Sequence, residues 1–149
     1  MKKVLLVTDG IVHPPIFACW ALRDTLMKVE GIEFSHTNSL ERLPDDLPSY
    51  AAIVLYFHHK SISDEAFEKL DSYVKNGGGI IGVHSATASF KEHLPYFKIL
   101  GGRFIDHGKV EPFTSRLNPD SEIFSEPADF TVKDELYIHD LEPDITVHY

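Results

Sequence analysis

The chain has 149 residues, which suits one domain, since domains commonly contain about 100–200 residues. Apolar residues make up 43% and charged residues 25%, so a wholly disordered chain is excluded and a core can form. The 23 acidic residues outnumber the 14 Lys and Arg residues, and the net charge of −9 disfavours nucleic-acid binding. No apolar run is long enough to cross a membrane, and the single cysteine, Cys19, fits a reducing compartment as an inert buried thiol. We therefore expect a cytoplasmic protein without a membrane or nucleic-acid partner.

The first hundred residues alternate short apolar runs with amphipathic segments, which is typical of βαβ units and a mainly parallel sheet. Continuous apolar runs predict strands that are buried on both faces. The predicted elements are strands over residues 4–8, 32–37, 51–57 and 80–84, a helix over 14–30, and a helix between Ser63 and Asn76. The strand over 32–37 alternates apolar and polar residues, so we expect it at the edge of the sheet.

Beyond residue 100 this alternation ends. Residues 101–107 and 110–113 resemble short irregular strands or loops, residues 134–137 resemble a short ordered segment, and 144–149 form a β-rich run.

Several predicted strands lead directly into histidines. His13 follows the first strand, His58 and His59 follow the third, and His84 ends the fourth. Ligands of open α/β sheets bind outside the carboxyl ends of the strands, close to the point where the strand order switches. The sequence therefore predicts a site at this edge, although His58 and His59 are typical of loop residues and at most one of them should face it.

The segment around His84 predicts a tight turn from a strand into a helix. Gly82 and Ala86 lie two residues before and after His84, and a nucleophile elbow needs small residues at these places. Because the residue at the tip is a histidine, acyl chemistry on a serine or cysteine there is excluded. Ser85 and Thr87 would then cap the helix or hydrogen-bond a ligand.

Four segments together resemble the trehalose-utilisation ThuA-like family of the class I glutamine amidotransferase-like superfamily. They are residues 3–8, residues 77–87 with the run Gly-Gly-Gly-Ile-Ile-Gly-Val-His-Ser-Ala-Thr, residues 101–107 with Gly-Gly-Arg-Phe and His107, and residues 134–137 with Asp-Glu-Leu-Tyr. The resemblance implies a flavodoxin-like three-layer αβα sandwich with a mainly parallel sheet. It also implies a role in carbohydrate metabolism, often beside oxidoreductases that make keto-sugars. By the same resemblance His84 stands where the amidotransferases have their cysteine, so glutaminase activity is not expected.

The family's polar motif positions fall on six residues of this chain: His84, Ser85, Arg103, His107, Asp134 and Glu135. The chain departs from the family pattern at His13, which is a displaced match, and at Ser121-Glu122-Ile123, where members often have His-Pro-Ile. It is expected to form one ThuA-like domain over residues 1–149 without the family's C-terminal strands.

These observations predict His-dependent acid/base chemistry on a sugar or keto-sugar, as hydrolysis, isomerisation or proton abstraction next to a carbonyl. The predicted catalytic residues are His84, His107 and Glu135, and the predicted substrate-binding residues are His13, Ser85, Thr87, Arg103 and Asp134. Arg103 suits a structural ion pair equally well. His36, His93, His139 and His148 are assigned to surface or packing roles.

Three alternatives stay open. A divalent metal such as zinc could be held by His84, His107 and a carboxylate such as Glu135, a ligand set that catalytic zinc uses. The chain could instead be a non-catalytic sugar-binding or regulatory subunit. An unfinished sheet edge would also favour assembly as a homo-oligomer.

Overall fold

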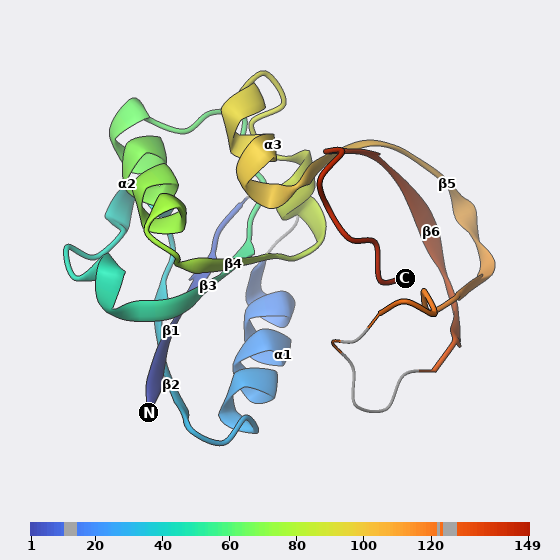
Figure 1. Ribbon diagram of the computed structural model, residues 1–149, viewed down its shortest axis with the longest axis horizontal. Helices are drawn as coiled ribbons and strands as arrows, with labels where there is room; N and C mark the ends of the chain where they lie inside the picture. The colour runs from blue at the N-terminus through green and yellow to red at the C-terminus, as the bar shows by residue number, and fades with distance from the viewer. Residues whose placement is uncertain (11–14, 122, 124–127) are drawn as a thin grey trace. The chain divides into compact units, whose positions relative to one another are not determined.

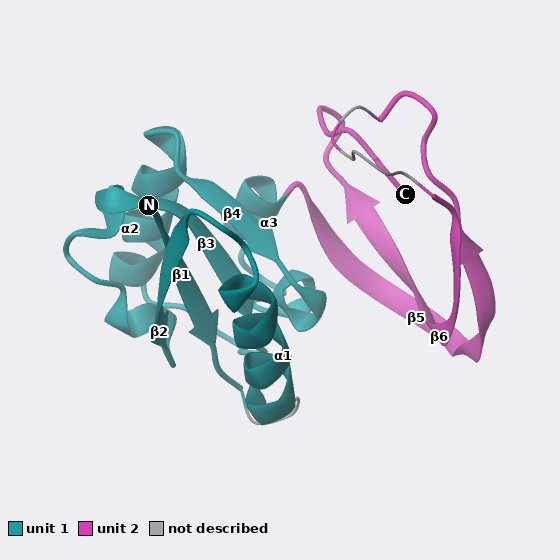
Figure 2. Cartoon of the chain, turned by 90° about the horizontal axis from the view of Figure 1, so that it is seen from below, with its two compact units in different colours: residues 1–100 teal, residues 101–149 magenta. Residues whose placement is uncertain are grey.

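A computed structural model describes residues 1–10, 15–121, 123 and 128–149. The chain divides into two compact units, Met1–Leu100 and Gly101–Tyr149, and each is described by itself (Figure 2). The single domain over residues 1–149 stays a prediction. Within the described ranges, no helix is long and apolar enough to cross a membrane.

Unit 1 is built on a four-stranded parallel sheet with the strand order β2-β1-β3-β4 (Figure 1). Its strands are β1 (Lys2–Thr8), β2 (Ile32–Thr37), β3 (Tyr50–Tyr56) and β4 (Gly79–Gly82). Its helices are α1 (Pro15–Met27), α2 (Asp64–Lys75) and α3 (Leu94–Leu100), with short 3-10 turns at η1 (Leu40–Arg42), η2 (Leu47–Ser49) and η3 (His84–Ala88). The four predicted strands and both predicted helices are thus confirmed, and β2 lies at an edge as expected.

The two central strands are apolar over residues 4–7 and 51–55 because helices cover both faces of the sheet. Successive side chains of a strand point to opposite faces. Leu5, Val7, Ile53, Leu55 and Phe57 belong to one core cluster with residues of α2 and α3, whereas Val4, Leu6 and Val54 pack with Cys19, Leu22 and Leu26 of α1. These two cores give the predicted layers of helix, sheet and helix.

β4 differs from the prediction of a buried strand. Ile81 is 55% exposed, and only Ile80 packs against the core that contains α2. Within unit 1, β4 is an edge strand that pairs only with β3, and edge strands keep one side open to solvent.

Unit 2 is a two-stranded antiparallel sheet of β5 (Gly102–Ser115) and β6 (Phe130–Leu141). The prediction of short irregular pieces is wrong here, because both strands are long. The pairing shifts register between Phe104 and Asp106 and again between His107 and Val110, and these irregularities break the period-two pattern that would have shown β5. The predicted β-rich run over 144–149 is not a strand; its backbone accepts hydrogen bonds from Asn118.

The ends of α2 follow the rules of helix capping. The Ser63 hydroxyl accepts a hydrogen bond from the Ala66 amide at 3.1 Å and donates to Glu41. Gly77 ends the helix with a φ of +92°, a conformation that glycine adopts without a steric penalty. The sequence prediction of both ends is confirmed.

Replacing Ser63 by Ala removes the cap of α2 and should lower the free energy of unfolding by about 1 kcal/mol. Urea denaturation of the wild type, Ser63→Ala and Ser63→Thr measures this, with threonine as the matched control because it keeps a capping hydroxyl. A Ser63→Ala protein as stable as the wild type would contradict the role given to the cap.

Candidate functional site

The carboxyl ends of β1, β3 and β4 bring together polar residues that are distant in sequence. The Asp9 amide donates to the Tyr56 carbonyl at 3.0 Å, and the Val83 amide donates to the Leu55 carbonyl at 2.9 Å. The Tyr56 ring is stacked near the His84 imidazole, with ring centres 5.9 Å apart and planes at 19°. The loops after all three strands therefore meet around Tyr56.

His84 stands in a strained turn at the end of β4. Its φ is +51°, a left-handed conformation that costs a non-glycine residue roughly 1–2 kcal/mol. Such strain persists only where the surrounding structure enforces it, and it concentrates at functional sites. The predicted tight turn is present, but η3 after it is a five-residue 3-10 turn instead of an α-helix.

The residues two positions before and after His84 are small and closely packed. A Cβ atom on Gly82 would lie 3.4 Å from Leu100 Cδ2 and 3.8 Å from the Ala86 Cβ atom, and Ala86 is fully buried. A side chain longer than alanine at the buried Ala86 position would have to displace its neighbours, which agrees with the elbow pattern in the sequence.

Ser85 and Thr87 are placed differently from each other. Ser85 is 2% exposed, and its hydroxyl has no hydrogen-bond partner among the described residues. Thr87 donates to the His84 carbonyl at 3.1 Å, which braces the turn. Their predicted roles in binding sugar hydroxyls stay predictions.

A carboxylate–imidazole pair spans the ends of β1 and β3. His59 Nε2 lies 2.9 Å from Asp9 Oδ2, while Asp9 Oδ1 accepts from the Gly10 amide at 2.7 Å. Sequence reasoning left Asp9 out and treated His59 as a loop residue. The signal that could have found the pair is that both residues follow strands predicted to be buried, so both stand at the same edge of the sheet.

At the end of β2, His36 bonds to the buried Thr8. The distance from His36 Nε2 to Thr8 Oγ1 is 2.8 Å, and Cys19 Sγ lies 3.8 Å from the same nitrogen. Partial burial lowers the pKa of His36 from 6.5, and the positive charge of Arg23 lowers this pKa further. His36 therefore favours its neutral form. Cys19, which the sequence predicted to be an inert buried thiol, lies beside this imidazole.

In unit 2, the structure brings His107 and Glu135 together. His107 Nδ1 lies 3.5 Å from Glu135 Oε1 and 2.9 Å from the Gly108 carbonyl oxygen. The Asp134 carboxylate accepts from the Glu135 amide at 2.8 Å, which orders the backbone at this point of β6.

Arg103 forms an ion pair within the same sheet. Its Nε and Nη2 atoms both donate to Asp140 Oδ2, at 3.1 and 3.0 Å. This contact supplies the structural role that the sequence left open, and its predicted contact with a substrate stays a prediction.

The predicted catalytic residues fall in both units, with His84 in unit 1 and His107 and Glu135 in unit 2. His13 and Glu122 lie outside the described residues. Over the ranges that the structure describes, no three His, Cys, Asp or Glu side chains gather to hold a metal ion.

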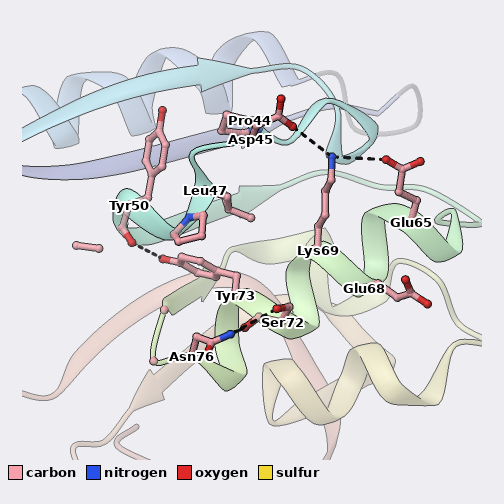
Figure 3. Close-up of a pocket in the computed structure, with 14 residues that line it drawn as sticks. Pro44, Asp45, Leu47, Tyr50, Glu65, Glu68, Lys69, Ser72, Tyr73 and Asn76 are labelled. Carbon is pink, nitrogen blue, oxygen red and sulfur yellow. Dashed lines mark hydrogen bonds and ion pairs between the residues drawn. The ribbon is translucent and has the colours of Figure 1, made fainter.

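A well-formed cavity lies at the opposite edge of the sheet, beside the amino end of β3 (Figure 3). Its volume is about 690 Å³. Lys69 extends into it and pairs with Asp45 at 3.8 Å and Glu65 at 3.5 Å, while the Tyr73 hydroxyl donates to the Tyr50 carbonyl at 3.1 Å. None of the described residues that were predicted as site residues lines this cavity, so we place the candidate site at the carboxyl edge, where His84, His59 and Asp9 lie.

Comparison with known proteins supports the fold. The family model of ThuA, described as trehalose utilisation, matches residues 3–149. A ThuA-like protein from Parabacteroides merdae ATCC 43184 has a TM-score of 0.78 at 19% identity, covering 91% of this chain and 62% of that chain. A glutamine amidotransferase from Thermotoga maritima has a TM-score of 0.54 at 11% identity, covering 97% of this chain and 65% of that chain. Comparison with curated proteins gives no match.

The two structural neighbours share with this chain a central parallel sheet flanked by helices, which confirms the class I glutamine amidotransferase-like, flavodoxin-like fold. At these identities the likeness shows the fold alone. The chain spans less than two thirds of the length of either neighbour.

The strain at His84 predicts an unusual order of stability. His84→Gly should be more stable than His84→Ala by about 1 kcal/mol, because glycine adopts a positive φ without a steric penalty. Urea denaturation measures the difference. The same two substitutions at Glu68, an exposed residue inside α2 whose φ is not positive, serve as the control and should favour alanine. Equal stability of the two His84 variants would contradict the strained turn.

The lowered pKa of His36 predicts how stability depends on pH. As the pH falls below 6.5, His36 is protonated in the unfolded chain before it is protonated in the folded chain. The free energy of unfolding therefore decreases until the pH falls below the folded-state pKa. His36→Gln removes this contribution while its amide can still bond to Thr8. Thermal unfolding between about pH 7.5 and pH 5 should show a smaller loss of stability in the variant than in the wild type. Parallel pH curves would refute the prediction.

Proposed function

The chain belongs to the ThuA family of trehalose utilisation, and from that premise we propose that it acts on a sugar or keto-sugar by histidine-dependent acid/base chemistry. His84 is the proposed acid/base group. The observation that carries this role is its left-handed φ of +51° at the end of β4, which fixes the imidazole at the edge where α/β proteins bind ligands.

The surroundings of His84 support a sugar as the ligand. The Tyr56 ring beside the imidazole offers an apolar face with a hydroxyl at its tip, and sugars combine apolar C–H faces with hydroxyl groups. Imidazole changes its charge near neutral pH, so His84 can donate or accept a proton there. His107 and Glu135, whose side chains lie 3.5 Å apart in unit 2, stay predicted catalytic residues.

A glutaminase reaction is not proposed, because it needs a nucleophilic thiol. The chain has one cysteine, Cys19, which lies on α1 with its Sγ 3.8 Å from His36 Nε2, and the residue at the tip of the tight turn is His84.

Replacing His84 by Ala should lower kcat/KM for the cognate keto-sugar by roughly 10²–10⁴-fold, the usual contribution of a general acid or base. Product analysis on a panel of trehalose-derived keto-sugars and glycosides measures turnover, and circular dichroism checks that the fold is kept. Glu135→Gln is tested in the same assay, and His93→Ala is the matched control.

Undiminished turnover in His84→Ala would refute the acid/base role. Calorimetric binding of these sugars by the wild type without any product would favour the alternative, a non-catalytic sugar-binding subunit.

A further inference from the structure

No role has yet been assigned to Asp9 or His59. Both residues lie at the edge of the sheet where ligands bind in this kind of fold. Asp9 follows β1 and His59 follows β3. In the parallel sheet β2-β1-β3-β4, the chain adds β2 on one side of β1 and then β3 on the other side, so the strand order switches between β1 and β3. Ligands of doubly wound sheets bind in the crevice at this switch point. The pair therefore stands where the fold itself places a ligand.

The main chain around the pair is held from several sides. The His59 amide donates to Ser89 Oγ at 3.2 Å, and the His59 carbonyl accepts from the Phe90 amide at 2.9 Å. Ser89 is fully buried and its hydroxyl also lies 3.0 Å from the Ser85 carbonyl, so the loop after β3 is tied to the turn that carries His84. Phe90 has a φ of +52°, a second strained residue in this support.

Gly10 holds the other half of the pair in place. Its φ is +122°, and a Cβ atom there would lie 3.0 Å from the His58 backbone nitrogen. Only glycine allows this close approach between the loops after β1 and β3. An exposed ion pair adds at most about 1 kcal/mol of stability, so stability alone gives little reason for such extensive support.

Asp9 sets the tautomer of His59. The carboxylate accepts only, so the neutral His59 ring keeps its proton on Nε2, at 2.9 Å from Asp9 Oδ2, and its lone pair on Nδ1. The side chains of His59 and Asp9 are 40% and 33% exposed, so a small ligand can reach the ring from solvent.

We propose that His59, oriented by Asp9, is the base that removes a proton from the carbon next to the carbonyl group of a keto-sugar. This inference rests on the proposed function and names its reaction. His59 Nδ1 accepts the proton, and the C–H electron pair becomes the C=C bond of an enol. The former π pair of the carbonyl group moves to the carbonyl oxygen, which also takes a proton from protonated His84. Return of the protons reverses the step or moves the carbonyl to the neighbouring carbon, with no oxidant or reductant. Asp9 acts as a positioning residue.

The experiment follows proton exchange at this carbon. A trehalose derivative oxidised to a ketone on one ring is incubated with the protein in D₂O, and proton NMR measures the exchange of the hydrogens next to the carbonyl. We expect exchange with the wild type, at least a hundredfold slower exchange with His59→Gln, and a loss in kcat of at least about tenfold, with KM little changed, for Asp9→Asn. His58→Gln is the matched control and should exchange like the wild type.

A second readout needs no substrate. Nitrogen-15 NMR of the His59 ring should show the Nε2–H tautomer in the wild type and a loss of this preference in Asp9→Asn, because an asparagine amide can donate as well as accept.

Two results would overturn this inference and leave the proposed function standing. They are proton exchange by His59→Gln at the wild-type rate, and an Nδ1–H tautomer in the wild type. Product formation that requires His84 without any exchange would do the same. Absence of both binding and turnover of sugars would instead overturn the proposed function, while the tautomer still reports on the pair.

Discussion

Parallel pairing of β1 with β3, with Val4 opposite Ala52 and Thr8 opposite Tyr56, determines which polar residues of unit 1 can meet. Because both strands are covered by helices on both faces, their side chains are apolar up to the point where the strands end. Polar side chains therefore occur only at the ends of these two strands. The register of this one pair therefore places Asp9 beside the loop that carries His59, and β4, paired with β3, adds His84 to the same edge.

The turn at His84 is stable because the rest of unit 1 compensates for its conformation. The cost of a left-handed residue, roughly 1–2 kcal/mol, is a noticeable share of the 5–15 kcal/mol by which domains are stable. The Val83–Leu55 hydrogen bond holds the chain before the turn, and the bond from Thr87 to the His84 carbonyl holds it after. A flexible loop would let the ring relax, so the same bonds that maintain the strain also fix the direction of the imidazole.

The sequence was sufficient for the parts of the fold that depend on neighbouring residues. The apolar run of β1, the Ser63 cap and the glycines after α2 each show their role within a few positions. β5 was missed because two register shifts interrupt its alternation, and the exposure of β4 was missed because an apolar run does not show whether a strand lies at the edge. The Asp9–His59 pair depends on the order of strands in space, which no single segment of sequence contains.

Two histidine–carboxylate pairs are present among the residues that the structure describes, and their geometry separates their roles. The Asp9–His59 distance of 2.9 Å fits a direct hydrogen bond, whereas His107 Nδ1 lies 3.5 Å from Glu135 and closer, at 2.9 Å, to the Gly108 carbonyl. A carbonyl oxygen only accepts, so it holds the proton of neutral His107 on Nδ1 and leaves the Nε2 lone pair, with Glu135 adding its charge from further away. The His59 ring is therefore oriented by a carboxylate at hydrogen-bond distance, which leaves Nδ1 as the ring's acceptor. The His107 ring is oriented chiefly by the Gly108 carbonyl, an arrangement that suits hydrogen bonding to a sugar oxygen.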